Sequence, residues 1–178
     1  GFWFTDAQFI PTKKHIQDAK LLLQAIKDQG WTDLKWAADI RADNIDRELA
    51  QLMVETGMSY FEIGITSGSQ ELVRKMQLAY NLKTVLENCR MLVEAGFRNH
   101  VSVNYSFNVF DETPNTIKQT VAYHRELENI FGKGLVDPAI FFIGLQPHTL
   151  LEKYALENNI LKPSYNPMSM MPWTARKL

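Results

Sequence analysis

The sequence has very little cysteine and no excess of charge of either sign. A single cysteine, Cys89, stands among 178 residues, which excludes an internal disulfide framework and a cysteine-rich metal site built from this chain alone. The 19 lysines and arginines are balanced by 20 aspartates and glutamates. The resulting net charge of −1 offers no long-range attraction to nucleic acid or to an anionic membrane.

Long apolar runs are also missing. No segment reaches the roughly 18 consecutive apolar residues that a membrane-spanning helix needs, and the N-terminus has no signal-peptide pattern. We therefore expect a cytoplasmic protein with neither a membrane nor a nucleic acid as its partner. Four histidines, at positions 15, 100, 124 and 148, lack the spacing of metal ligands, so no metal site is predicted within the chain.

Hydrophobic residues, in contrast, make up 46% of the chain, enough for a substantial core in one domain. The most informative stretch is Met58–Ser69, an aromatic and β-branched run that ends in small hydroxyl residues and glycine. Its pattern predicts a buried strand followed by a polar turn. Because the chain begins inside an apolar run, Gly1–Phe4, we expect it to be a piece of a longer protein.

The pattern of a strand followed by a helix occurs five times. Strands are expected at residues 2–4 together with 8–10, and at 34–40, 58–66, 100–109 and 139–145. Helices are expected to begin near Thr12, Asp46, Gln70 and Thr113, with a break near residues 79–81, and a short last helix is expected up to about Asn158. This alternation predicts an α/β fold with a parallel sheet. The domain is expected to span residues 1–160, with an irregular extension over 161–178.

Polar side chains recur where the predicted strands end. They are Asp6 and Gln8, Asp39 and Arg41, Thr66 and Ser67, Asn108 with Asp111 and Glu112, and Gln146 with His148. Right-handed crossovers bring these strand ends to one rim, which is where barrels and open α/β sheets bind ligands. A small-molecule site at this rim is one interpretation, and ordinary loop and cap residues are the other.

Six short motifs, taken in order, carry a resemblance to a known family. They are FTDAQF at 4–9, IRAD at 40–43, GITSGSQE at 64–71, EAG at 94–96, DET at 111–113 and QPHTLL at 146–151. Their order and spacing resemble strands two to six of a radical S-adenosylmethionine enzyme. The branch with an N-terminal cobalamin-binding domain, which contains anaerobic magnesium-protoporphyrin ester cyclase and various methyltransferases, is the most similar. The resemblance implies a partial, TIM-like (β/α)6 barrel, of which this chain would supply about five parallel strands.

The resemblance also implies that the rim binds S-adenosylmethionine. Asp6 and Gln8 occupy the place of the segment that binds the amino group of this cofactor, and an ammonium group needs such acceptors. Thr66 and Ser67 fall where the family contacts the ribose or the methionine part, although Thr66 replaces the usual Glu or Gln. Glu112 matches an acid near the adenine.

Further positions differ from the family or have two interpretations. Asn108 replaces a glycine at the rim, and Leu78 stands where a basic residue often meets the methionine carboxylate. Arg41 is expected to pair with a carboxylate, either that of a ligand or that of Asp39 or Asp43. The CxxxCxxC segment that holds the [4Fe-4S] cluster is absent, so the cluster ligands are expected outside this chain, and the chain alone is predicted to be inactive.

The intact protein is therefore expected to be a radical S-adenosylmethionine enzyme of the oxidoreductase or methyltransferase type, with cobalamin, where used, in a separate domain. Two alternatives stay open. An ordinary α/β-barrel lyase or phosphate-ester enzyme would bind phosphate near Ser67–Gln70, and a degenerate, noncatalytic domain would bind a partner instead. The exposed aromatic edge at Phe2–Phe4 is predicted to favour dimerisation.

Overall fold

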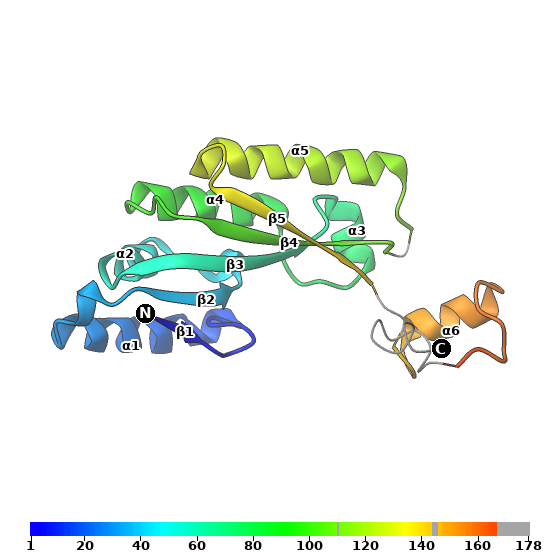
Figure 1. Cartoon of the computed structure of the whole chain (residues 1–178), viewed down its shortest axis with the longest axis horizontal. Helices are drawn as coiled ribbons and strands as arrows, with labels where there is room; N and C mark the ends of the chain where they lie inside the picture. Colours follow the sequence, from blue (N-terminus) through cyan, green and yellow to red (C-terminus); the bar gives the residue numbers. More distant parts are fainter. Residues whose placement is uncertain (110, 144–145, 167–178) are drawn as a thin grey trace.

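The computed structural model describes residues 1–109, 111–143 and 146–166. Five strands form one parallel sheet, in the order in which they occur along the chain (Figure 1). They are β1 (Phe2–Phe4), β2 (Trp36–Ile40), β3 (Met58–Thr66), β4 (Val101–Phe107) and β5 (Val136–Phe142). The parallel arrangement, the sequential order and the edge position of β1 confirm the predicted fold class.

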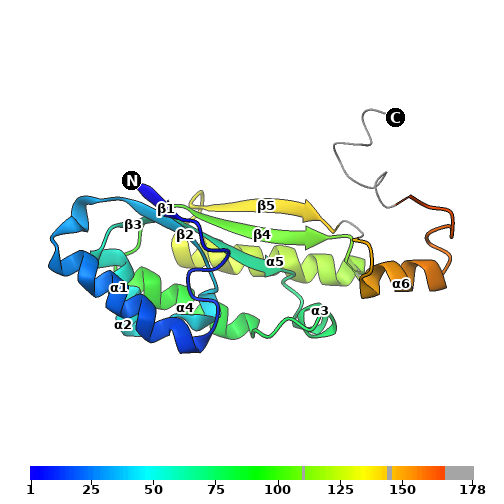
Figure 2. The ribbon, with the colours of Figure 1, turned by 90° about the horizontal axis from the view of Figure 1, so that it is seen from below.

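The helices are α1 (Ile16–Asp28), α2 (Arg47–Glu55), α3 (Gln70–Lys75), α4 (Leu82–Glu94), α5 (Pro114–Phe131) and α6 (Leu150–Glu157), with short 3-10 turns η1 (Lys13–His15), η2 (Trp31–Asp33) and η3 (Ala42–Asn44). The helices α1 to α5 connect successive strands and lie on the same face of the sheet, whereas α6 follows β5 and lies beyond the carboxyl ends of the strands (Figure 2). Among the residues that the structure describes, none forms a helix on the opposite face of the sheet (Figure 2). All strands therefore present their carboxyl ends at one edge, next to an uncovered face.

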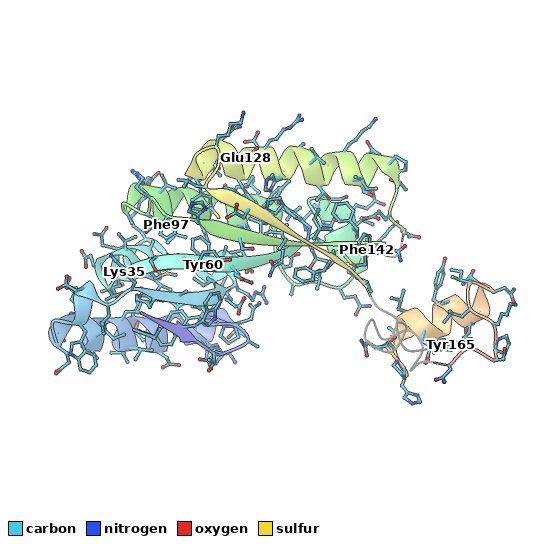
Figure 3. The ribbon with its side chains drawn as sticks, viewed as in Figure 1. Lys35, Tyr60, Phe97, Glu128, Phe142 and Tyr165 are labelled. Carbon is cyan, nitrogen blue, oxygen red and sulfur yellow. The ribbon has the colours of Figure 1, made fainter. Side chains whose placement is uncertain are left out.

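The core fills the layer between the sheet and the helices (Figure 3). Phe61 is fully buried at its centre, and its ring meets those of Phe97 and Phe131 at centroid distances of 5.1 and 5.9 Å. Cys89 lies on the buried stripe of α4 with Val85 and Leu92, as its helical spacing predicts.

Local sequence explains where several helices begin and end. Thr113 caps α5 by accepting a hydrogen bond from the Thr116 amide, and Pro114 occupies the first helical position, as predicted. Asp46 caps α2 through the Leu49 amide. Gly57 follows α2 with a φ of 89°, a conformation that glycine adopts without steric cost.

Three predicted boundaries were wrong. Residues 8–10 form no strand; the Phe9 amide donates to the Asp39 carbonyl near the end of β2, and the Ile10 carbonyl accepts from Asn44 Nδ2. β2 begins at Trp36 rather than residue 34, because Leu34 caps the end of η2, where its amide donates to the Trp31 carbonyl. β5 begins at Val136 rather than at Ala139, because Pro138 is tolerated in a strand that pairs on one side with β4.

Part of the predicted C-terminal structure lies outside the described residues. This applies to residues 144–145 of the expected last strand and to 167–178 of the expected extension, including Met168, Met170 and Met171. Residues 161–166 contain bends and turns without a helix or strand. Within the described ranges, none of the helices combines the length and the apolar character needed to cross a bilayer. The domain boundary at residue 160 stays a prediction.

Candidate functional site

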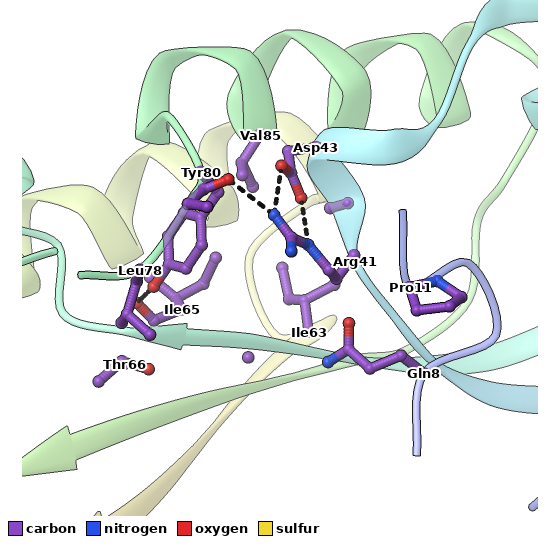
Figure 4. Close-up of a pocket in the computed structure, with 13 residues that line it drawn as sticks. Gln8, Pro11, Arg41, Asp43, Ile63, Ile65, Thr66, Leu78, Tyr80 and Val85 are labelled. Atoms are coloured by element: carbon purple, nitrogen blue, oxygen red, sulfur yellow. Dashed lines mark hydrogen bonds and ion pairs between the residues drawn. The ribbon is translucent and has the colours of Figure 1, made fainter. Parts of the chain in front are cut away.

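A cavity of about 370 Å³ opens at the carboxyl ends of β1, β2 and β3 (Figure 4). Gln8 enters it from the loop after β1, Arg41 from the end of β2, and Gly64 and Thr66 from β3. The segment between α3 and α4 closes the other side with Leu78 and Tyr80. Three residues of the predicted site, Gln8, Arg41 and Thr66, therefore line one cavity.

Arg41 is fixed in this cavity by three hydrogen bonds. Its Nε donates to Asp43 Oδ1 at 3.0 Å and its Nη2 to Asp43 Oδ2 at 2.8 Å, while Nη2 also donates to the Ala79 carbonyl at 2.9 Å (Figure 4). The hydrogen bonds with Asp43 raise the pKa of Arg41 above its ordinary value. Of the two carboxylates proposed as internal partners, the structure selects Asp43. Nη1 has no hydrogen-bond acceptor among the described residues.

Gln8 brings an unsatisfied acceptor to the same cavity. Its Oε1 atom is buried and has no hydrogen-bond partner among the residues that the structure describes. A buried amide oxygen without a partner costs free energy, which a donor from a bound molecule would recover. The cavity therefore offers an acceptor at Gln8 and a cationic donor at Arg41.

The segment between α3 and α4 is held against the sheet by Tyr80. Its hydroxyl donates to the carbonyl of Ile65, near the end of β3, and burial raises its pKa to about 12 (Figure 4). Gln70 Nε2 donates to the Tyr80 carbonyl at 3.2 Å, which ties the same segment to α3. Tyr80 was not among the predicted site residues, because its contact with Ile65 follows from the tertiary fold and no local motif indicates it.

Thr66 separates this cavity from a second one. It ends β3 in a left-handed conformation, with a φ of 57°, and the register between β3 and β4 shifts just before it. The second cavity, of about 610 Å³, is lined by Thr66 and Leu78, by Ser106 of β4, and by Leu150 and Tyr154 of α6. Thr66 and Leu78 border both cavities, so an elongated molecule could occupy the two together.

The other predicted site residues line neither cavity. Asp6 is exposed in the loop after β1. Ser67 is buried, and its hydroxyl lies 3.4 Å from that of Thr120 on α5. Asn108 has a φ of 62°, and its amide donates to Glu112 Oε2 at 2.9 Å, so these two residues brace the loop between β4 and α5.

The turn at Ser67–Gln70 is packed against α5, which disfavours the phosphate-binding alternative. The Gly68 amide donates to Thr120 Oγ1 at 3.0 Å, and the Ser69 amide donates to Ser67 Oγ at 3.1 Å. A Cβ atom on Gly68 would come within 2.6 Å of the Thr120 Cα atom. Two amides that would cradle a phosphate are thus already used within the protein.

The described residues do not fit an iron–sulfur cluster. Such a cluster needs several thiolates, and burial raises the pKa of the single cysteine, Cys89, to about 12. In the parts of the chain that the structure describes, no three histidine, cysteine, aspartate or glutamate side chains are grouped to hold a metal ion.

The solved structures that share this fold belong to proteins much longer than this chain. The radical S-adenosylmethionine methyltransferase TsrM from Kitasatospora setae, solved with its tryptophan substrate and an analogue of S-adenosylmethionine, matches with a TM-score of 0.66 and 19% identity over 88% of this chain and 29% of its own. A structure of TsrM with cobalamin and a [4Fe-4S] cluster gives 0.65 and 20% identity, over 88% and 30% of the two chains. Coproporphyrinogen III oxidase (HemN) from Escherichia coli, described as a radical SAM enzyme, gives 0.58 and 13% identity, over 94% and 37%. The chain thus spans about a third of the length of these proteins.

Sequence comparison assigns the family. A search of the curated proteins found no match. The family model described as the radical SAM superfamily matches residues 12–123, from the turn before α1 into α5. Because this segment is more than half of the chain and includes most of the described cavity, the chain belongs to the radical SAM superfamily.

Proposed function

We propose that this chain is part of a radical S-adenosylmethionine enzyme and that the Arg41 cavity holds the methionine end of the cofactor. The observation that carries the proposal is the buried, unpartnered Oε1 atom of Gln8 in a cavity at the carboxyl ends of the strands. An ammonium group supplies the donor that this atom lacks. Arg41 Nη1, which has no acceptor among the described residues, would donate to the carboxylate of the same amino acid.

The remaining parts of the cofactor would extend past Thr66 into the second cavity. Leu78 and Leu150 provide apolar surface there, and the Thr66 hydroxyl at the boundary suits a ribose hydroxyl. Asp6, Ser67, Asn108 and Glu112 line neither cavity. Their roles in binding stay predictions.

In the intact enzyme, S-adenosylmethionine supplies an adenosyl radical or a methyl group when an iron–sulfur cluster is bound. The contribution of this chain would be to bind and orient the cofactor and to exclude water, since its described residues do not fit the cluster. Whether the reaction is an oxidation or a methyl transfer, and whether a cobalamin domain takes part, depends on the rest of the enzyme. The likeness to TsrM supports the methyltransferase with cobalamin as the first choice.

Binding measurements on one variant test the proposal. Gln8→Leu removes the acceptor and should weaken S-adenosylmethionine binding by roughly tenfold, the loss of one hydrogen bond to a charged group. Methylthioadenosine, which has neither the ammonium nor the carboxylate, should bind both proteins equally. Gln24→Leu is the matched control, because Gln24 lies on α1, where its amide donates to Asp28. The proposal would be contradicted if Gln8→Leu lowered the affinity for both ligands equally, or lowered the affinity for neither.

A further inference from the structure

The helix-free face of the sheet carries a row of acidic and polar side chains. The strand register places Asp39 of β2 beside Glu62 of β3, Glu62 beside Ser102 of β4, and Ser102 beside Asp137 of β5. Their neighbours along the strands, such as Phe61, belong to the core beneath the sheet. Because side chains alternate between the two faces of a strand, the row points to the uncovered face (Figure 2).

Asp39 and Glu62 form a pair of carboxyl groups that lacks a cation. Neither takes part in an ion pair within the described residues, where the nearby Arg41 is paired with Asp43 and His100 lies 3.1 Å from Asp137. Burial, followed by the charge of Glu62 and a hydrogen bond between the two carboxyls, raises the pKa of Asp39. A positive charge from outside would relieve the repulsion between the two groups.

The side chains around Glu62 hold its carboxylate in place and leave one hydrogen-bond acceptor, Asn104 Oδ1, without a donor. Tyr60 donates its hydroxyl to Glu62 Oε1 at 3.1 Å, and Asn104 Nδ2 lies 3.3 Å from Glu62 Oε2. These two hydrogen bonds fix the orientation of the carboxylate. Asn104 Oδ1 is buried and has no partner among the described residues, which is an independent sign that a donor is missing on this face.

The helix-free face is open beside this pair, over Gly64. Gly64 lies opposite Asn104 in the register, two residues beyond Glu62 along β3, and a Cβ atom built on it meets nothing within 4 Å. Gly64 also lines the Arg41 cavity. Two residues of a strand span about 6.6 Å, so a group held by the carboxyl pair would have its next atoms over Gly64, in the direction of the carboxyl ends of the strands.

We propose that Asp39 and Glu62 bind a protonated amine or guanidine of the substrate, with Asn104 Oδ1 as a third acceptor, so that the substrate extends over Gly64 toward S-adenosylmethionine. The proposal rests on the proposed function for the position of the cofactor, and it adds the chemical class of the substrate. A cationic nitrogen provides several N–H donors and a positive charge, which match two carboxylates and an amide oxygen.

Titration of the full chain with simple amines tests the proposal, with the amide signals of Gly64 and Asn104 followed by NMR. Butylammonium and agmatine should produce saturable shifts at these residues, with an affinity about tenfold or more above that of butanol, which lacks the charge. This comparison uses the unaltered protein, so it does not depend on the folding of a variant. Equal binding of butanol, no binding of either amine, or displacement of the amines by Mg²⁺ would overturn the proposal.

Isosteric variants test which carboxylates of the row bind the amine. The double variant Asp39→Asn with Glu62→Gln should lose amine binding about tenfold, whereas Asp137→Asn, which removes a carboxylate of the same row that His100 already bonds, should change it less than about twofold. Binding of S-adenosylmethionine should be the same in both variants, which separates this site from the one that Gln8→Leu tests. Undiminished amine binding by the double variant would overturn the assignment.

Discussion

Arg41 forms a bidentate ion pair with Asp43, and the same guanidinium group donates a hydrogen bond to the carbonyl of Ala79, 38 residues further along the chain. The end of β2 is thereby joined to the segment between α3 and α4. A guanidinium group can form this planar set of hydrogen bonds, and a lysine ammonium, which is a point charge on a flexible stem, cannot. Arg41 therefore stabilises one side of the cavity, and its Nη1 atom can still donate a hydrogen bond to a ligand.

The variant Arg41→Lys should lower the free energy of unfolding by about 1 kcal/mol, since it loses part of this partly buried set of hydrogen bonds. Urea-induced unfolding measures the change. Arg47→Lys is the matched control, because Arg47 forms an exposed ion pair with Glu94, and such pairs contribute less than about 1 kcal/mol. Equal effects of the two replacements would show that the bond to Ala79 does not stabilise the fold.

Gly64 of β3 and Gly68 of the turn that follows this strand should differ in their response to alanine. Gly68→Ala would place a methyl group 2.6 Å from Thr120 Cα and 2.7 Å from Tyr123 Cβ, and such overpacking costs roughly 1–3 kcal/mol. Gly64→Ala meets open space, so its effect on stability should stay within about 1 kcal/mol. Thermal unfolding of both variants provides the comparison, and a destabilised Gly64→Ala with an unaffected Gly68→Ala would contradict the packing of Gly68 on α5.

The carboxyl pair should make stability depend on pH. The pKa of Asp39 is raised above its ordinary value near 3.8, so the folded protein keeps this proton to a higher pH than the unfolded chain does. Between the two pKa values the folded state binds more protons, and stability contributed by Asp39 falls as the pH rises. Asp39→Asn should therefore raise the melting temperature at pH 7, and the gain should vanish below pH 3.8. A lower melting temperature of the variant at neutral pH would show that ionised Asp39 stabilises the folded protein, contrary to this prediction.

Cys89 should behave as a core residue. It lies on the buried face of α4, and burial raises its pKa to about 12, so hardly any thiolate forms at pH 8. Modification by a thiol reagent should be slow in buffer and rapid and complete in urea. Incubation of the chain with iron and sulfide under anaerobic conditions should likewise give no stoichiometric cluster. Rapid modification of the folded chain would show that α4 does not bury this residue.

Much of the fold could be predicted because most strands are β-branched or aromatic runs, and because capping side chains mark the beginnings of α2, α4, α5 and α6. The errors occur where tertiary contacts override local pattern. Phe9 and Ile10 are apolar like Phe2–Phe4, yet the Phe9 amide bonds to the Asp39 carbonyl near the end of β2 instead of continuing a strand. Asp137 and Pro138 resemble a turn, but they lie in β5, where the register places them beside Ser102 and Val103.

The candidate site was less predictable than the fold. The sequence indicates which residues follow the strands, and Gln8, Arg41 and Thr66 do line one cavity. It does not indicate that the side chain of Ser67 turns toward Thr120, 53 residues later. Nor does it indicate that Tyr80 closes the cavity by bonding to Ile65. Such orientations depend on the packing of distant segments, and no local spacing encodes them.

The central claim is that S-adenosylmethionine binds at the Arg41 cavity. Its most direct test is a titration of the isotope-labelled chain with S-adenosylmethionine, followed residue by residue through the backbone amide signals in NMR spectra. Saturable changes should be concentrated at Gln8, Gly64, Thr66 and Ala79, which line this cavity. Changes confined to the separate groove that Arg47 and Gln51 line on the helical side, or no saturable change at the four cavity residues, would contradict it.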